Sequence, residues 1–404
     1  RANLQTILDN LTAGVIVLDP SGVILSSNPG ATRILRVPVA VYESQPLTQL
    51  PQLQAFATGV LQAFDQWGAS GGAHELDHWQ KSFELHESGQ GLSQTSVTLL
   101  ARGANLAALR QSGVTLVRPD GQAQSTPVRL LGPTDPPGSF DLIIVTLKSM
   151  QLASAAADMM ARLAPGGALL MIQNGLPWWY FDELDGPWKN RRLPSLDPDG
   201  ILARTIASNR VVGAVIIRPV IQLGVARYLV PEFPQSVLRL GEIQSEPTAR
   251  IHRIAELIGP TLACEPVADI RQAKWAKLMR NLLWNTLCAL SQSGPDRYAQ
   301  NDLGRELVRH VAREGMAVAR SVGQTIQLDI EAELEGVRQE PGHTPSMLQD
   351  VRAGRALETD AILKCVIEIG EWTGTPTPTL RTLCALLEVM QSAMLTKGRG
   401  IGYL

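Results

Sequence analysis

Three polar residues recur at intervals of four in an otherwise apolar stretch of the chain. They are Lys277, Asn281 and Asn285, in the segment KWAKLMRNLLWNTL. On an α-helix this spacing places the three side chains on one face, with a drift of about 40° per step. Polar groups on a mostly buried helix are costly when unpaired, so the pattern favours a polar cavity. The alternative is a helix whose polar stripe is simply solvated.

The residue types in this stripe suit one kind of chemistry. Lysine donates a proton, and burial lowers its pKa, whereas the asparagine amide both donates and accepts hydrogen bonds. A 2-oxo acid offers a carbonyl oxygen and a carboxylate to such groups. The stripe therefore predicts a site for a small 2-oxo acid.

The stripe lies in a region that reads as helical throughout. Strand signals stop after about residue 268, and the 3.6-residue periodicity of buried helices takes over. The expected helices cover residues 270–290, 302–322, 359–373 and 377–395. We therefore expect an all-α domain at 268–404.

The preceding region alternates between helices and strands, which is typical of a parallel sheet with crossover helices. We expect helices at 105–112 and 152–163 and strands at 114–117, 141–147 and 168–172. The continuous apolar run 141–147 is typical of a central strand covered on both faces. The strand 168–172 delivers Gln173, Asn174 and Gly175 to its carboxyl end, where ligands bind in open α/β sheets.

The first 96 residues have a different order, with a helix at 4–11, a hairpin around Asp19-Pro20-Ser21-Gly22, and strands near 79–85 and 96–100. The string LDNLTAGVIVLDPSGVILSSNPGATRILRVP resembles a PAS sensor domain of nitrogen-regulation histidine kinases. The resemblance implies an α+β fold for residues 1–96. The alternative is a generic α+β module without a ligand.

Composition excludes several classes of function. The formal net charge is -2, with 36 basic and 38 acidic side chains, so nothing indicates binding to nucleic acid or to an anionic membrane. No apolar run approaches the ~20 residues of a membrane-spanning helix. The four cysteines lack the spacing of a zinc site or a disulfide framework, which favours a reducing cytoplasm, and the histidines form no metal-ligand pattern.

Five motifs along the rest of the chain, including the lysine-asparagine helix, resemble the ketopantoate reductase family in order. They are TLLARGANLAAL, IIVTLKSMQ, IQNGLPWW, KWAKLMRNLLWNTL and PSMLQDVRAGRALETD. The resemblance covers residues from about 97 to 404. It implies reduction of 2-dehydropantoate, or a related 2-oxo acid, by hydride transfer from NADPH, and it allows a homodimer.

The resemblance also implies roles for single residues. Lys277 would be the general acid that protonates the carbonyl oxygen, and Glu358 would close the site beside the nicotinamide and the substrate. The residues that would hold the substrate are Asn281, Asn285 and Ser346. The residues that would contact the cofactor are Lys148, Asn174 and, at the adenosine 2′-phosphate, Arg102. Taken singly, each of these residues could instead be a turn residue, a helix cap or a solvated charge.

The chain departs from the family in one respect. The family resemblance calls for a strand and a GxGxxG loop about 20 residues before Arg102, and the sequence has no such motif there. Glycines of that loop let the backbone approach the pyrophosphate, and the following helix N-terminus supplies partial positive charge. Loss of this central strand would expose the edges of two apolar strands. We therefore expect NADPH binding to be weak.

The fold class expected is multidomain: a PAS-like α+β domain at 1–96, a truncated Rossmann-like α/β domain at 97–267 and an all-α domain at 268–404. The function expected is that of a ketopantoate reductase with impaired activity. The bulky run Trp178-Trp179-Tyr180 could line a different pocket, which leaves another branched 2-oxo acid open. The alternative function is a PAS-type ligand-sensing or interaction module fused to an inert reductase fragment.

Overall fold

The structure is a computed structural model. It describes residues 15–61 and 96–401, apart from 20, 29–30, 33–34, 36, 52, 55, 59, 245, 340–341 and 399. The chain divides into two compact units, Arg1–Ser96 and Val97–Leu404.

The described part of the first unit is built on the expected hairpin. Strands β1 (Ile16–Leu18) and β2 (Ile24–Ser27) pair antiparallel. The turn between them is held by Asp19, whose carboxylate accepts the backbone N–H groups of Ser21 and Val23. Two 3-10 turns follow, η1 (Val39–Tyr42) and η2 (Leu47–Gln49), and they pack a small core with β2. The hairpin prediction is confirmed, whereas the helix expected at 4–11 and the strand expected near 79–85 lie outside the described residues.

A five-stranded sheet forms the base of the second unit. Its order is β13-β12-β9-β8-β7. The strands are β7 (Phe140–Val145), β8 (Leu163–Met171), β9 (Val211–Ile217), β12 (Val237–Glu242) and β13 (Cys264–Pro266). Strands β7, β8 and β9 run parallel, and β12 joins β9 antiparallel. The expected parallel strands at 141–147 and 168–172 are therefore confirmed, with β8 starting earlier than expected.

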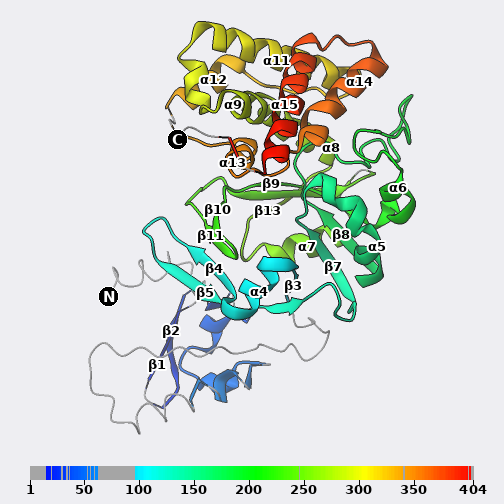
Figure 1. The fold of residues 1–404 in the computed structure, drawn as a ribbon. Helices are drawn as coiled ribbons and strands as arrows, with labels where there is room; N and C mark the ends of the chain where they lie inside the picture. Colours follow the sequence, from blue (N-terminus) through cyan, green and yellow to red (C-terminus); the bar gives the residue numbers. More distant parts are fainter. Residues whose placement is uncertain are drawn as a thin grey trace. The chain divides into compact units, whose positions relative to one another are not determined.

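Helices cover both faces of this sheet, as the apolar residues of its central strands require (Figure 1). Leu169 and Met171 face helices α5 (Leu152–Arg162) and α6 (Ile201–Thr205). Ala168 and Leu170, on the opposite face, pack against α7 (Ala249–Ile258). This layering is the α/β arrangement that the alternating sequence pattern predicts.

The expectation that residues 141–147 form a central strand is wrong. Within the described part of the chain, β7 has a strand neighbour on one side only, and Ile144 is 48% exposed. Strand β3 (Thr98–Leu100) pairs only with β6 (Arg129–Leu131) in a separate two-stranded sheet, and Leu100 is 50% exposed. The expected pair of open strand edges is thus confirmed for the described residues.

The remaining strands and the first helix of this unit lie near β3. Helix α4 (Gly103–Ser112) follows β3 directly. A four-stranded sheet has the order β10-β11-β4-β5 and contains β4 (Val114–Val117), β5 (Ala123–Thr126), β10 (Ile221–Gly224) and β11 (Arg227–Leu229). Helix α4 and strand β4 confirm the expectations for 105–112 and 114–117.

After β13 the described residues form helices joined by loops, and Figure 1 shows these helices on one side of the five-stranded sheet. The helices are α8 (Ile270–Arg280), α9 (Thr286–Ser291), α10 (Pro295–Ala299), α11 (Asp302–Ser321), α12 (Ile330–Gln339), α13 (Ser346–Arg352), α14 (Cys365–Thr373) and α15 (Pro378–Lys397). Two π-helical turns, η5 (Asn281–Asn285) and η6 (Asp360–Lys364), interrupt the regular geometry. No helix among the described residues is long and apolar enough to cross a membrane.

Candidate active site

Helix α8 carries the predicted lysine across the carboxyl ends of two neighbouring strands. Asp269 caps its first turn by accepting the Gln272 backbone N–H at 2.9 Å. Five residues after Asp269, Lys274 Nζ donates to the backbone oxygen of Gln173, just after β8, at 2.8 Å. Lys277 Nζ donates to the backbone oxygen of Ile216, near the end of β9, at 2.8 Å. The two ammonium groups therefore lie at the sheet edge where ligands bind in α/β folds.

The loop after β8 fits tightly between β7 and the helices. The Gln173 side chain donates to the backbone oxygens of Val145 and Leu147, at 2.7 and 3.1 Å. Gly175 has a φ of +78°, and a Cβ there would lie 2.0 Å from the Ala361 backbone oxygen. A glycine is therefore required at this turn. Asn174, between them, is held in place on both sides.

Glu358 is the buried carboxyl group of the site. Its Oε1 lies 3.4 Å from the Ser149 backbone nitrogen, which donates to it, and its side chain is also hydrogen-bonded by Asn174. Burial raises the pKa of Glu358, and this effect outweighs the Ser149 N–H and the Lys148 ammonium, which lower it. A carboxyl group with a raised pKa can exchange a proton closer to neutrality.

Lys148 connects the end of β7 to the helical part. Its Nζ donates to Asp350 of α13 at 2.7 Å and to the Ala356 backbone oxygen at 2.9 Å. Asp350 also accepts from Arg355 at 2.7 Å, so it is paired with two cations. The Lys148 ammonium is therefore held at the Ala356 carbonyl, two residues before Glu358 in the chain.

The first π-helical turn holds the two predicted asparagines. The side-chain amide nitrogens of Asn281 and Asn285 are buried and have no hydrogen-bond partner. The Asn285 amide oxygen accepts from the Ser346 hydroxyl at 3.4 Å. π-Helical turns are frequent at functional sites, and buried amide donors without partners are unfavourable. Two donors are thus available to oxygens of a ligand.

Burial lowers the pKa of both lysines toward neutral pH. Burial lowers the pKa of Lys277 to about 8, while the Glu358 carboxylate opposes the shift. Burial and, to a smaller extent, the neighbouring Lys277 ammonium lower the pKa of Lys274 to about 7, and Glu358 again opposes the shift. An ammonium group with a pKa near the working pH is a good general acid.

The aromatic run after Asn174 splits between two environments. Trp178 and Trp179 line a cavity of about 20 Å³ together with Ser149 and Gln173. Tyr180 is instead buried in the helical core, where its hydroxyl accepts from Trp275 Nε1 at 2.7 Å. The expectation that all three residues line a pocket is therefore wrong for Tyr180, because its hydroxyl is used in core packing.

The structure brings most of the predicted site residues together. Glu358 is hydrogen-bonded to Asn174 and interacts by charge with Lys148 and Lys277, Ser346 is hydrogen-bonded to Asn285, and Asn281 lies about one helical turn from Lys277. Arg102 is elsewhere: it is exposed at the N-terminus of α4, after the separate strand β3. The prediction missed Lys274, Gln173 and Asp350. The spacing of Lys274 and Lys277, three residues apart, was the available signal for the first.

Two family models and two curated relatives match most of this chain. The family model described as ketopantoate reductase PanE/ApbA matches residues 83–177, and the one described as ketopantoate reductase PanE/ApbA C terminal matches residues 269–391. A 2-dehydropantoate 2-reductase of Mesorhizobium japonicum is 32% identical over 295 residues, which cover 73% of this chain and 90% of the relative. A 2-dehydropantoate 2-reductase of Halobacterium salinarum is 26% identical over 306 residues, which cover 74% and 92%.

A solved structure is similar over the same range. The crystal structure of a putative ketopantoate reductase from Ralstonia solanacearum has a TM-score of 0.68 and 32% sequence identity. The match covers 74% of this chain and 91% of that one. The Rossmann-like sheet and the helical domain therefore both have counterparts in a solved relative.

Proposed function

Because the chain belongs to the ketopantoate reductase family, we propose that it reduces 2-dehydropantoate, or a related 2-oxo acid, to the 2-hydroxy acid with NADPH. The observation that supports this most directly is the placement of Lys277 beside Glu358 at the carboxyl edge of the sheet. A proton donor and a buried carboxyl group at that edge suit reduction of a carbonyl group.

The residues fit the cofactor in part. Asn174, Lys148 and Glu358 lie together at the sheet edge, where we propose that they contact the nicotinamide end of NADPH. Arg102, exposed at the start of α4, is our proposed contact for the 2′-phosphate. Among the described residues no strand pairs with both β3 and β7. The sequence also has no GxGxxG loop for the pyrophosphate. Bound NADPH would supply the hydride.

The tasks of the chain's own residues follow from their contacts. In our proposal Lys277 gives its proton to the carbonyl oxygen as the alcohol forms. The amide nitrogens of Asn281 and Asn285, which lack partners, donate to substrate oxygens. Ser346, hydrogen-bonded to Asn285, provides a further hydroxyl. Glu358, with its raised pKa, accepts a hydrogen bond from the substrate or the Lys277 ammonium.

We further propose the domain division 1–96, 97–267 and 268–404, with a PAS-like module first. The hairpin of the first unit supports the module, because buried Asn28 connects it to the following segment by accepting the N–H groups of Val15 and Ala31. A cytoplasmic location is a proposal as well. It is supported by the cysteines, all of which are free thiols.

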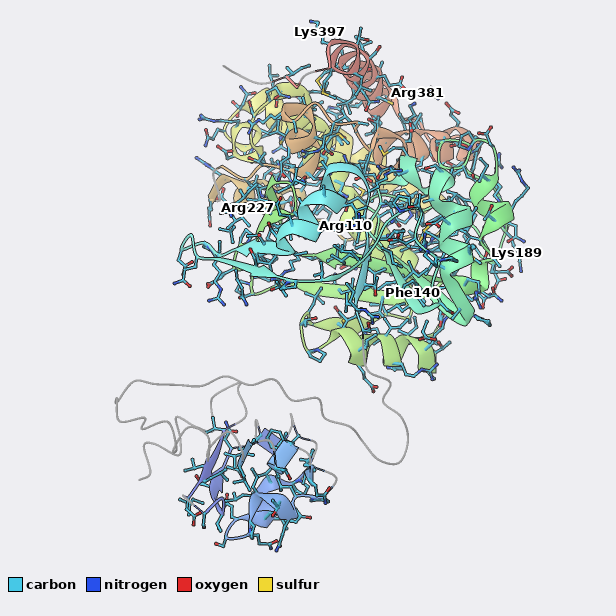
Figure 2. The ribbon with its side chains drawn as sticks, turned by 60° about the horizontal axis from the view of Figure 1, so that its bottom comes forward. Arg110, Phe140, Lys189, Arg227, Arg381 and Lys397 are labelled. Atoms are coloured by element: carbon cyan, nitrogen blue, oxygen red, sulfur yellow. The ribbon has the colours of Figure 1, made fainter. Side chains whose placement is uncertain are left out.

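The test is NADPH oxidation by the purified full chain with 2-dehydropantoate or pyruvate. We expect slow turnover that prefers 2-dehydropantoate and disappears in Lys277→Met. The matched control is Lys189→Met, since Lys189 is a half-exposed lysine at the periphery of the second unit (Figure 2). Turnover that is the same in Lys277→Met and in the wild type would contradict the proposal.

A further inference from the structure

Lys274 lies in the candidate site but has no task in the reaction described above. Its side chain is 3% exposed, and its Nζ donates to the Gln173 backbone oxygen at 2.8 Å. Burying an ammonium group is unfavourable unless polar partners compensate. An apolar side chain of similar length would pack here without that cost. The charged group at this position therefore needs an explanation beyond packing.

The hydrogen bond of Lys274 begins a connection across the sheet edge. Gln173, which accepts it, donates through its own side chain to the backbone oxygens of Val145 and Leu147 at the end of β7. Lys148 directly follows Leu147 in the chain. Helix α8 is thereby tied to the ends of both β8 and β7.

The same connection returns to the helix by the other side of the site. Lys148 donates to Asp350 of α13 at 2.7 Å. Helix α13 begins at Ser346, whose hydroxyl donates to Asn285 at 3.4 Å. Asn285 ends the π-helical turn that continues α8. Lys274 therefore completes a closed series of contacts. Asn174 lies next to Gln173 in this series, and Glu358 is hydrogen-bonded to Asn174.

We propose that Lys274 is a positioning residue for the reduction, which holds the loop carrying Asn174 against the helix carrying Lys277. The proposal rests on the proposed function, from which Asn174 and Lys277 take their tasks. A displacement of about 1 Å between cofactor and proton donor is enough to slow catalysis by ~10²-fold. Other direct ties of this segment to α8 lie farther along it, at Tyr180, whose hydroxyl accepts from Trp275 and whose backbone oxygen accepts from Arg271, so the Lys274 bond is the tie next to Asn174.

The charges around Lys274 agree with this task. The groups that act on it are Lys277 on its own helix and Glu358 from the segment before η6, the first repelling and the second attracting its ammonium. Burial lowers the pKa of Lys274 to about 7, below that of Lys277. Both the ammonium and the neutral amine of Lys274 can donate to the Gln173 carbonyl, so this hydrogen bond does not depend on the protonation state of Lys274.

The test compares Lys274→Met, Lys274→Arg and the surface control Lys189→Met by amide hydrogen exchange. The reporter is the Leu176 amide, which donates to the Ala361 backbone oxygen at 2.9 Å in the same loop. We expect ~10-fold faster exchange there in Lys274→Met, with helices α11 and α15 unchanged. Lys274→Arg, which keeps a donor, should restore part of the protection.

Turnover measured on the same samples completes the test. We expect kcat to fall ~10–100-fold in Lys274→Met while the KM for the 2-oxo acid changes little. Unchanged exchange at Leu176, or faster exchange throughout the molecule, would overturn the proposal, and so would a loosened loop with unchanged kcat. Absence of turnover in the wild type would instead contradict the proposed function, and the exchange data would still decide whether Lys274 anchors the loop.

Discussion

The helix side and the sheet side of the candidate site differ in completeness. On the helix side, α8 and the segment before η6 bring Lys277 close to Glu358, and η5 and α13 bring Asn285 and Ser346 together. On the sheet side, β7 and β3 belong to separate sheets within the described residues. The difference teaches that the positions of Lys277 and Glu358 depend on the helices together with the ends of β7, β8 and β9, whereas a full cofactor site also requires a strand that joins β3 to β7.

The largest effect is expected at the centre of the complete side. Lys277→Met removes the proposed general acid, and we expect kcat to fall ~10²–10⁴-fold, because that is the usual contribution of a positioned proton donor. Steady-state kinetics would measure the loss, with Lys189→Met as the control. A fall of less than about tenfold would mean that another group, or water, supplies the proton.

A glycine at the meeting point of the two sides should be the next most sensitive. Gly175→Ala places a Cβ 2.0 Å from the Ala361 backbone oxygen at a φ of +78°, and we expect it to destabilise the fold by about 2–4 kcal/mol. Gly166→Ala is the matched control, since it has a φ of +88° but no atom within 4 Å. Denaturant unfolding would separate strain from collision. Equal losses in both variants would show that the close approach to η6 is unimportant.

Replacing an unpartnered amide should leave the free energy of unfolding unchanged or higher, while it weakens binding of the substrate. Asn281→Leu removes a buried donor without a partner, so the free energy of unfolding should be unchanged or higher. The KM for the 2-oxo acid should rise ~10–100-fold, because a hydrogen bond to a charged oxygen is lost. Parallel unfolding and kinetic measurements check both halves. A clear loss of stability would assign Asn281 to the fold and not to the substrate.

The pH dependence should give the smallest effect. Lys277 must be protonated to act as an acid, and its pKa in the ligand-free chain is lowered to about 8, so kcat/KM should be level below pH 8 and fall about tenfold per pH unit above it. Lys274 and Glu358 are the charged groups that modulate this titration. Lys277→Arg, whose guanidinium stays protonated, should lose the alkaline limb. An alkaline limb that persists in Lys277→Arg would assign it to another group.

The local part of this structure was predictable from sequence, and the non-local part was not. Periodicity located helix α8, which carries Lys277, because helix geometry follows from nearby residues. The π-helical turn at Asn281 was not predicted, since it depends on packing against other helices. The apolar run 141–147 indicated a strand correctly but a central position wrongly, because the position of β7 depends on a neighbour that the described chain lacks.

The sequence also did not predict which residues form hydrogen bonds with the site residues. Lys148 was predicted as a cofactor contact, yet its partner Asp350 lies about 200 residues away along the chain. Lys274 was passed over although it lies three residues before Lys277, because that spacing alone does not distinguish a buried lysine from a solvated one. Burial and a backbone acceptor distinguish it only in three dimensions.

Among the described residues, the helix side of the site has its proposed proton donor and substrate ligands, whereas the sheet side lacks a strand that joins β3 to β7 for the cofactor. This difference can be measured as NADPH affinity. It is tested most directly by titrating NADPH against the full chain and against a variant in which residues 1–96 are replaced by a strand, a GxGxxG loop and a helix. We expect the replacement to tighten NADPH binding by at least ~100-fold, since several charged hydrogen bonds to the pyrophosphate are gained, each contributing about 1.5–3 kcal/mol. Equal and tight NADPH binding by both chains would contradict the account.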